Sequence, residues 1–106
     1  MKVTFGFELP RYSGEYSNWY SRYMTLTSGE YFGIYYDGVT SASLTNYGNQ
    51  LKQIGFAFDQ EEFDNYGYYV YYLKGKTING VYEPWLQLAY QDGTLVVAVP
   101  YTILES

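Results

Sequence analysis

The sequence contains no cysteine and no histidine among its 106 residues. Without cysteine the protein has no disulfides, no thiolate metal ligands and no cysteine nucleophile. Without histidine it lacks the commonest general base and the commonest transition-metal ligand. We therefore expect neither zinc chemistry nor a histidine-dependent catalytic triad.

Long apolar runs and catalytic motifs are missing as well. No run of about 18 apolar residues is present, so we expect no membrane span. The N-terminal MKVTFGFELP lacks the continuous apolar core of a signal peptide, which favours a cytoplasmic protein. The motifs GxSxG, GxGxxG and GxxxxGK[ST] are absent, and Gly75-Lys76-Thr77 matches only the end of the last one. We expect a protein that is not an enzyme and that carries no cofactor and no metal.

Basic residues are few, with 6 Lys and Arg against 11 Asp and Glu, which gives a net charge of -5. Binding to a phosphate backbone needs clustered lysine and arginine, so direct binding of nucleic acid is not expected. An acidic surface instead suits a protein partner with a basic surface.

Tyrosine is the abundant residue, at 16 of 106 positions, beside 6 Phe and 2 Trp. Aromatic side chains favour strands and also dominate binding surfaces. A small core cannot give every one of these phenol hydroxyls a hydrogen-bond partner. Some of the tyrosines must therefore lie at the surface.

Asp92-Gly93 separates two apolar runs and is a strong signal for a type I′ hairpin turn. With this two-residue loop, Gln91 pairs with Thr94 and the register continues to Leu86 with Val99. One face then carries the apolar set Leu86, Leu88, Tyr90, Leu95, Val97 and Val99. The pattern predicts a hairpin over 85–99 at the centre of the fold.

The first 40 residues predict further strands. Residues 2–9 alternate between apolar and polar and indicate a half-buried strand. Residues 15–27 fit either a helical stripe or a strand, and we favour a strand for the later half. A turn at Ser28-Gly29 would lead into a strand over 30–36, and Asp37-Gly38 would close it. The pairs expected from that turn are Leu26 with Tyr31 and Thr25 with Phe32.

Residues 43–54 predict a helix, because Leu44, Tyr47, Leu51 and Ile54 share one helical face. Gly55 stands where a left-handed C′ residue is expected. Gly48 costs about 1 kcal/mol inside a helix relative to alanine.

The predicted fold is α+β, with residues 1–106 forming a single small domain. An antiparallel sheet of five or six strands would have the hairpin 85–99 at its centre and the helix 43–54 packed on one face. The alternative is a small all-β barrel.

Two neighbouring stretches are candidates for a site. Residues 59–65 carry Asp59, Glu61, Glu62 and Asp64, which favours a solvated loop over a calcium loop, since the glycine and closing glutamate of an EF-hand are missing. Carboxylates spaced like phosphates are a third interpretation. Residues 66–72 form a strand that is aromatic on both faces. It could anchor a partner or stack on a ligand, or it could simply fill a sheet face.

In composition the chain is similar to small non-catalytic inhibitors and immunity proteins encoded by bacteria and their phages. We therefore expect a small binding protein that neutralises a larger basic partner, such as a nucleic-acid enzyme, in the manner of an anti-defence protein. The expected partner-binding residues are Tyr66, Tyr68, Tyr69, Tyr71, Glu61, Glu62 and Asp64. One alternative is a module that stacks a sugar or nucleotide on tyrosines. Another is a self-assembling structural subunit, such as a virion component, and exposed strand edges would also permit a homodimer.

Overall fold

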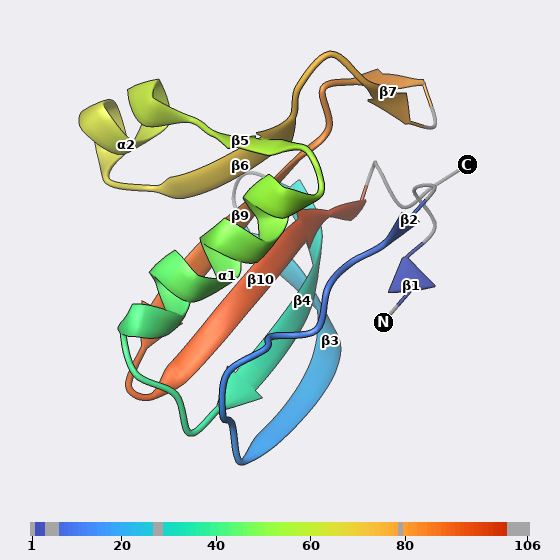
Figure 1. Ribbon diagram of the computed structural model, residues 1–106. Coiled ribbons are helices and arrows are strands. Elements are labelled where there is room, and N and C mark those ends of the chain that lie inside the picture. Colours follow the sequence, from blue (N-terminus) through green and yellow to red (C-terminus); the bar gives the residue numbers. More distant parts are fainter. Residues whose placement is uncertain (1, 4–6, 27–28, 79, 102–106) are drawn as a thin grey trace.

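The computed structural model describes residues 2–3, 7–26, 29–78 and 80–101. Its main feature is a six-stranded antiparallel sheet in the order β3-β4-β10-β9-β6-β5 (Figure 1). The strands of this sheet are β3 (Asn18–Leu26), β4 (Gly29–Asp37), β5 (Phe56–Phe58), β6 (Tyr69–Leu73), β9 (Trp85–Gln91) and β10 (Thr94–Pro100). The sheet is open, with β3 and β5 at its edges, so the α+β prediction is confirmed and the barrel alternative is not.

The hairpin of β9 and β10 occupies the centre of the sheet, as the Asp92-Gly93 signal predicts. Both turn residues have positive φ, 48° and 83°, which is the geometry that a type I′ turn requires. The predicted register is present from Gln91 opposite Thr94 to Gln87 opposite Ala98. The predicted apolar face forms the core, where Leu86, Leu88, Leu95, Val97 and Val99 are almost fully buried.

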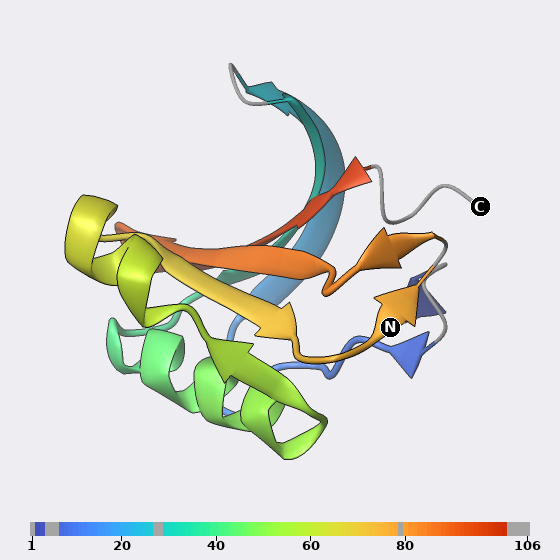
Figure 2. The same cartoon turned by 90° about the horizontal axis from the view of Figure 1, so that it is seen from above.

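Helix α1 (Ala42–Gln53) packs on that apolar face of the sheet (Figure 2). Tyr47 and Leu51 point into the core and are fully buried, as the helical stripe predicts. The predicted helix 43–54 is wrong at its end, since α1 stops at Gln53 and Ile54 is 43% exposed rather than part of the core face. Gly55 has a φ of 105° just past the helix, in the left-handed region that favours glycine.

The strands β3 and β4 form a long hairpin whose far end bends toward the side of the sheet opposite α1 (Figure 2). The strand predicted for the later half of residues 15–27 is confirmed and begins earlier, at Asn18, but the predicted turn is off in register. Leu26 pairs with Gly29 and Thr25 with Glu30, so the two-residue loop is 27–28 rather than Ser28-Gly29. That loop itself lies outside the described residues.

The N-terminal residues do not form the single strand expected for 2–9. Instead β1 (Lys2–Val3) pairs with β2 (Phe7–Glu8) in a small separate sheet, and residues 4–6 between them lie outside the description. The chain then runs along the core, where Leu9 and Tyr12 are buried. Pro10 contributes its carbonyl oxygen, which accepts a 2.6 Å hydrogen bond from the Tyr47 hydroxyl.

Helix α2 (Gln60–Tyr66) replaces the acidic loop that the sequence predicts. Asp59 is its N-cap and accepts a 3.2 Å hydrogen bond from the backbone N–H of Glu62. Glu61 and Glu62 occupy the first turn, where the helix dipole favours negative charge. Gly67 ends the helix with a φ of 75°.

A second small sheet lies between β6 and β9 in the chain. Its strands, β7 (Thr77–Ile78) and β8 (Val81–Tyr82), form a short hairpin. No helix in the described part of the chain is long and apolar enough to cross a membrane.

Candidate functional site

The tyrosine-rich strand β6 divides its side chains between the two faces of the sheet. Tyr71 lies opposite Leu86 and so faces the core, whereas Tyr72 lies opposite Trp85 and faces away from it. We call the side that carries Trp85 and Tyr72 the open face, because α1 packs against the other side and no helix of the described residues covers this one (Figure 2).

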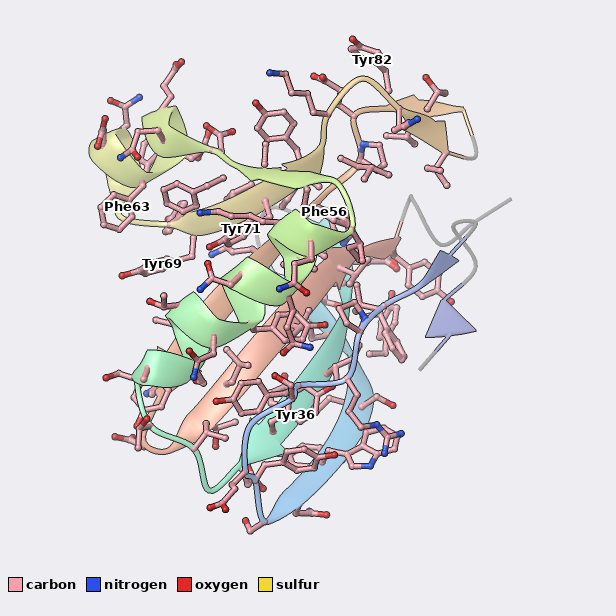
Figure 3. The ribbon with its side chains drawn as sticks, viewed as in Figure 1. Tyr36, Phe56, Phe63, Tyr69, Tyr71 and Tyr82 are labelled. Carbon is pink, nitrogen blue, oxygen red and sulfur yellow. The ribbon has the colours of Figure 1, made fainter. Side chains whose placement is uncertain are left out.

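Tyr71 belongs to the core and is only 5% exposed, so a partner cannot reach it. The prediction that Tyr71 binds a partner is therefore wrong. Its ring packs on Phe58 at 5.3 Å and its hydroxyl stands against Gly48 of α1, where a Cβ atom would be (Figure 3). Burial raises the pKa of the Tyr71 hydroxyl. Gly48 therefore has a packing reason inside the helix, since it makes room for this ring.

Tyr69 lies on the same side as Tyr71 but is only half-buried. Its ring packs on Phe63 of α2 at 5.1 Å and lies beside a small cavity of about 180 Å³ next to α1. Its main contacts hold α2 against the sheet (Figure 3). Of the four predicted contact tyrosines, Tyr69 and Tyr71 thus face α1.

Tyr66 and Tyr68 are exposed, and their rings stack at 5.7 Å with an interplanar angle of 21°. Neither is in a strand as predicted, because α2 ends at Tyr66 and the left-handed Gly67 turns the chain before β6 starts at Tyr69. Tyr68 lines the same pocket as Tyr72, so it reaches the open face.

The three predicted acidic residues all lie on α2 but point in different directions. Glu62 is partly buried at the open face, whereas Glu61 and Asp64 are exposed on the outer surface of the helix. Asp64 accepts a 2.9 Å hydrogen bond from the Gln60 side chain. The structure therefore brings together Glu62 and Tyr68, and separates them from Glu61, Asp64, Tyr69 and Tyr71.

A pocket of about 620 Å³ is hollowed in the open face, and we call it the open-face pocket. Its floor is the sheet itself at Val70 and Gln87. Five aromatic side chains from four separate segments line the pocket: Tyr31 from one, Tyr68 and Tyr72 from a second, Tyr82 from a third and Trp85 from a fourth. Its acidic lining consists of Asp59, Glu62 and Glu83.

The rings of the open-face pocket range from buried to fully accessible. Tyr31 is buried and meets Trp85 edge-on at 6.1 Å, which fixes the Trp85 ring at the pocket wall. Trp85 remains 36% exposed and Tyr82 is 68% exposed. Tyr82 projects outward from the short sheet of β7 and β8 (Figure 3). The pocket therefore has one fixed aromatic wall, at Tyr31 and Trp85, and the more exposed ring of Tyr82 lies beside it.

Two of the three carboxylates of the pocket are held by backbone N–H groups. Asp59 caps α2, and Glu83 accepts a 2.9 Å hydrogen bond from the N–H of Gly75. Glu83 also has a φ of 51°, an uncommon conformation for a residue other than glycine. Among the described residues that line the pocket none is basic, so it presents three acids without a countercharge of its own.

The described residues contain no group of three or more acidic side chains arranged to hold a metal ion. The three pocket acids are spread around the rim. The arrangement is suited to a polar or cationic group that contacts aromatic rings and carboxylates together.

Sequence reasoning missed most of the open-face pocket, namely Tyr31, Tyr72, Tyr82, Trp85 and Glu83. One signal was available: the hairpin register puts Trp85 on the face opposite Leu86 and Leu88. The capping pattern from Asp59 to Glu62 also indicates the start of a helix. The pairing of β6 with β9, which selects Tyr72 over Tyr71, has no local signal.

The chain matches no protein-family model, no curated protein and no solved structure.

Proposed function

We propose that this protein is a small, non-catalytic binding protein that neutralises a larger basic partner by covering one of its surfaces with the open face. The observation that carries this proposal is the open-face pocket, in which five aromatic rings and three carboxylates gather on a sheet face that no helix in the described part of the chain covers. Aromatic side chains anchored in or beside pockets provide most of the energy of many protein interfaces.

Charge supports the same assignment. The chain carries a net charge of -5, and acidic residues lie both in the pocket and on the adjoining surface of α2. Such a distribution speeds association with a basic surface and weakens as salt rises. Glu61 and Asp64 would steer the encounter, while Glu62 and Tyr68 would form part of the final contact. The partner would be a cytoplasmic protein with a basic surface, such as a nucleic-acid enzyme.

Affinity capture with matched baits tests the proposal. The wild-type protein, the open-face variant Tyr82→Ala/Trp85→Ala and the control variant Thr45→Ala/Asn49→Ala are used in parallel on a lysate of the native host. The control changes two exposed residues of α1 that border the small cavity on the α1 side of the sheet, away from the open face. The proposal predicts a stoichiometric partner that wild type and control retain and that the open-face variant loses, and whose own activity falls when the wild-type protein is added. Retention of the partner by the open-face variant would contradict it.

The volume of the pocket supports a second candidate function. About 620 Å³ is within the range of roughly 300–1,000 Å³ that is typical of small-molecule sites. A sugar could stack on Trp85 while its hydroxyls donate to the pocket carboxylates, whereas the same carboxylates disfavour a nucleotide phosphate. A melting temperature that rises with glycan concentration, together with no captured partner, would favour this function over the first.

A further inference from the structure

The open-face pocket combines two features that attract positive charge. One is a wall of aromatic faces and edges around Trp85, and the other is a rim of carboxylates with no basic residue among the described lining residues. Aromatic faces attract cations through the ring quadrupole, and carboxylates attract them through charge. Both features select the same ligand chemistry, which is an organic cation.

The chemistry of the lining favours a planar cation over a compact one. A guanidinium group can stack on an aromatic ring and at the same time donate paired hydrogen bonds to a carboxylate at its edge. Glu62 and Trp85 offer these two partners within one pocket. An ammonium group acts as a strongly hydrated point charge and gains less from the flat wall.

This chain already uses the ring half of that contact twice, with its own arginines. The guanidinium carbon of Arg11 lies 5.0 Å from the centre of the Trp19 ring, and that of Arg22 lies 5.7 Å from the centre of the Tyr35 ring. Both of its arginines therefore rest on aromatic rings. The open-face pocket has the rings and the carboxylates for a third such contact, without an arginine of its own to fill it.

We propose that the open-face pocket binds the guanidinium group of an arginine side chain presented by the partner protein. Trp85 supplies the stacking surface, Glu62 accepts the hydrogen bonds, and Tyr68 and Tyr82 close around the aliphatic stem. The proposal rests on the proposed function in that it names the partner group that the open face recognises.

The test uses the acetylated and amidated tripeptide Gly-Arg-Gly and its citrulline counterpart, which keeps the shape of arginine but has no charge. Trp19→Phe leaves Trp85 as the only tryptophan of the chain, so its fluorescence reports on the pocket. We expect saturable binding of the arginine peptide, about tenfold tighter than that of the citrulline peptide, because charge-assisted hydrogen bonds are roughly twice as strong as neutral ones. Equal binding of the two peptides, or no saturable change with either, would overturn the proposal.

Two neighbouring glutamates provide a matched pair of variants. Glu62→Gln removes the charge that lines the pocket, whereas Glu61→Gln removes an equal charge from the same turn of α2 outside the pocket. We expect about a tenfold loss of arginine-peptide affinity for Glu62→Gln and less than a twofold change for Glu61→Gln. Equal losses would show a general charge effect and would overturn the site. Thermal unfolding confirms that each variant is folded.

The possible outcomes distinguish a failure of the arginine-binding proposal from a failure of the proposed function. If the partner is lost by Tyr82→Ala/Trp85→Ala but the arginine peptide does not bind, the guanidinium assignment fails and the binding function stands. If the arginine peptide binds but the variant still captures the partner, the pocket stands and the proposed interface fails. A lysine peptide that binds more tightly than the arginine peptide would overturn the choice of a planar cation.

Discussion

Tyr71 and Tyr72 are neighbours on β6, identical in chemistry and opposite in surroundings. Tyr71 is enclosed between the sheet and α1, where burial raises the pKa of its hydroxyl. Tyr72 lies on the open face beside Trp85 and lines the pocket. The difference shows that a tyrosine-rich strand can stabilise the fold with one face and leave the other available for binding.

The largest expected effect on stability concerns Tyr71, on the face of the sheet that α1 covers. Tyr71→Ala should lower the free energy of unfolding by about 3–5 kcal/mol, because it empties a space that the surrounding core cannot fill. Tyr72→Ala should cost only about 1 kcal/mol, because its ring is partly in solvent already. Urea unfolding followed by circular dichroism measures both, and equal losses would remove the distinction between the two faces.

Gly48→Ala is expected to have the next largest effect on the free energy of unfolding. Helix propensity alone would predict a gain in stability, whereas we expect a loss. Alanine favours a helix by about 1 kcal/mol over glycine. At this position the new Cβ would stand 2.7 Å from Cζ of Tyr71, so we expect a loss of about 1–3 kcal/mol instead.

A double-mutant cycle sharpens this prediction. Combined with Tyr71→Leu, the cost of Gly48→Ala should shrink, since the ring that it collides with is gone. The exposed neighbour substitution Asn49→Ala serves as the control and should be neutral or slightly stabilising. A gain in stability from Gly48→Ala alone would mean that Tyr71 does not pack on α1.

A smaller expected effect is the dependence of stability on pH that comes from Tyr47, which α1 buries in the core. Burial raises the pKa of Tyr47 well above its usual value of 10.0. The folded protein therefore retains this proton in a range where the unfolded chain releases it, so stability is full below about pH 10 and falls as pH rises further.

Tyr47→Phe isolates this contribution. The variant should lose about 1 kcal/mol at pH 7, where it lacks the hydrogen bond to the Pro10 carbonyl oxygen. Above pH 10 its stability should fall less steeply than that of the wild type. Parallel urea titrations at pH 7 and at pH 11 measure the two slopes. An identical alkaline decline in both proteins would contradict a buried, protonated Tyr47.

The smallest effect on stability is expected on the open face. Tyr82→Ala should change the free energy of unfolding by no more than about 0.5 kcal/mol, since the side chain is largely exposed. The same substitution should weaken binding of the arginine peptide. A large loss of stability would show that Tyr82 has a structural role.

The predictable part of the fold is the part with local signals. The Asp92-Gly93 turn and the alternation around it gave the central hairpin in register, and the spacing of Tyr47 and Leu51 gave α1. Helix α2 also had a local signal in its cap at Asp59, which the dense negative charge of the segment obscured.

The candidate site was less predictable because it is assembled from distant segments. Glu62 and Tyr68 were identified from the charge and aromatic content of one stretch. Tyr31 and Trp85 reach the same pocket only because β4, β10, β9 and β6 lie in that order in the sheet. Strand order is set by the packing of the whole chain, so the choice between Tyr71 and Tyr72 could not be made from residues 66–72 alone.

The most direct test of the account measures stability and partner binding together for the two neighbouring tyrosines. Tyr71→Phe keeps the core filled and removes only a buried hydroxyl, whereas Tyr72→Ala removes a ring from the open-face pocket. We expect that Tyr71→Phe still captures the partner that wild type captures. We expect that Tyr72→Ala remains folded but captures much less of this partner. Full capture by Tyr72→Ala, with loss of capture by Tyr71→Phe, would contradict the assignment of binding to the open face.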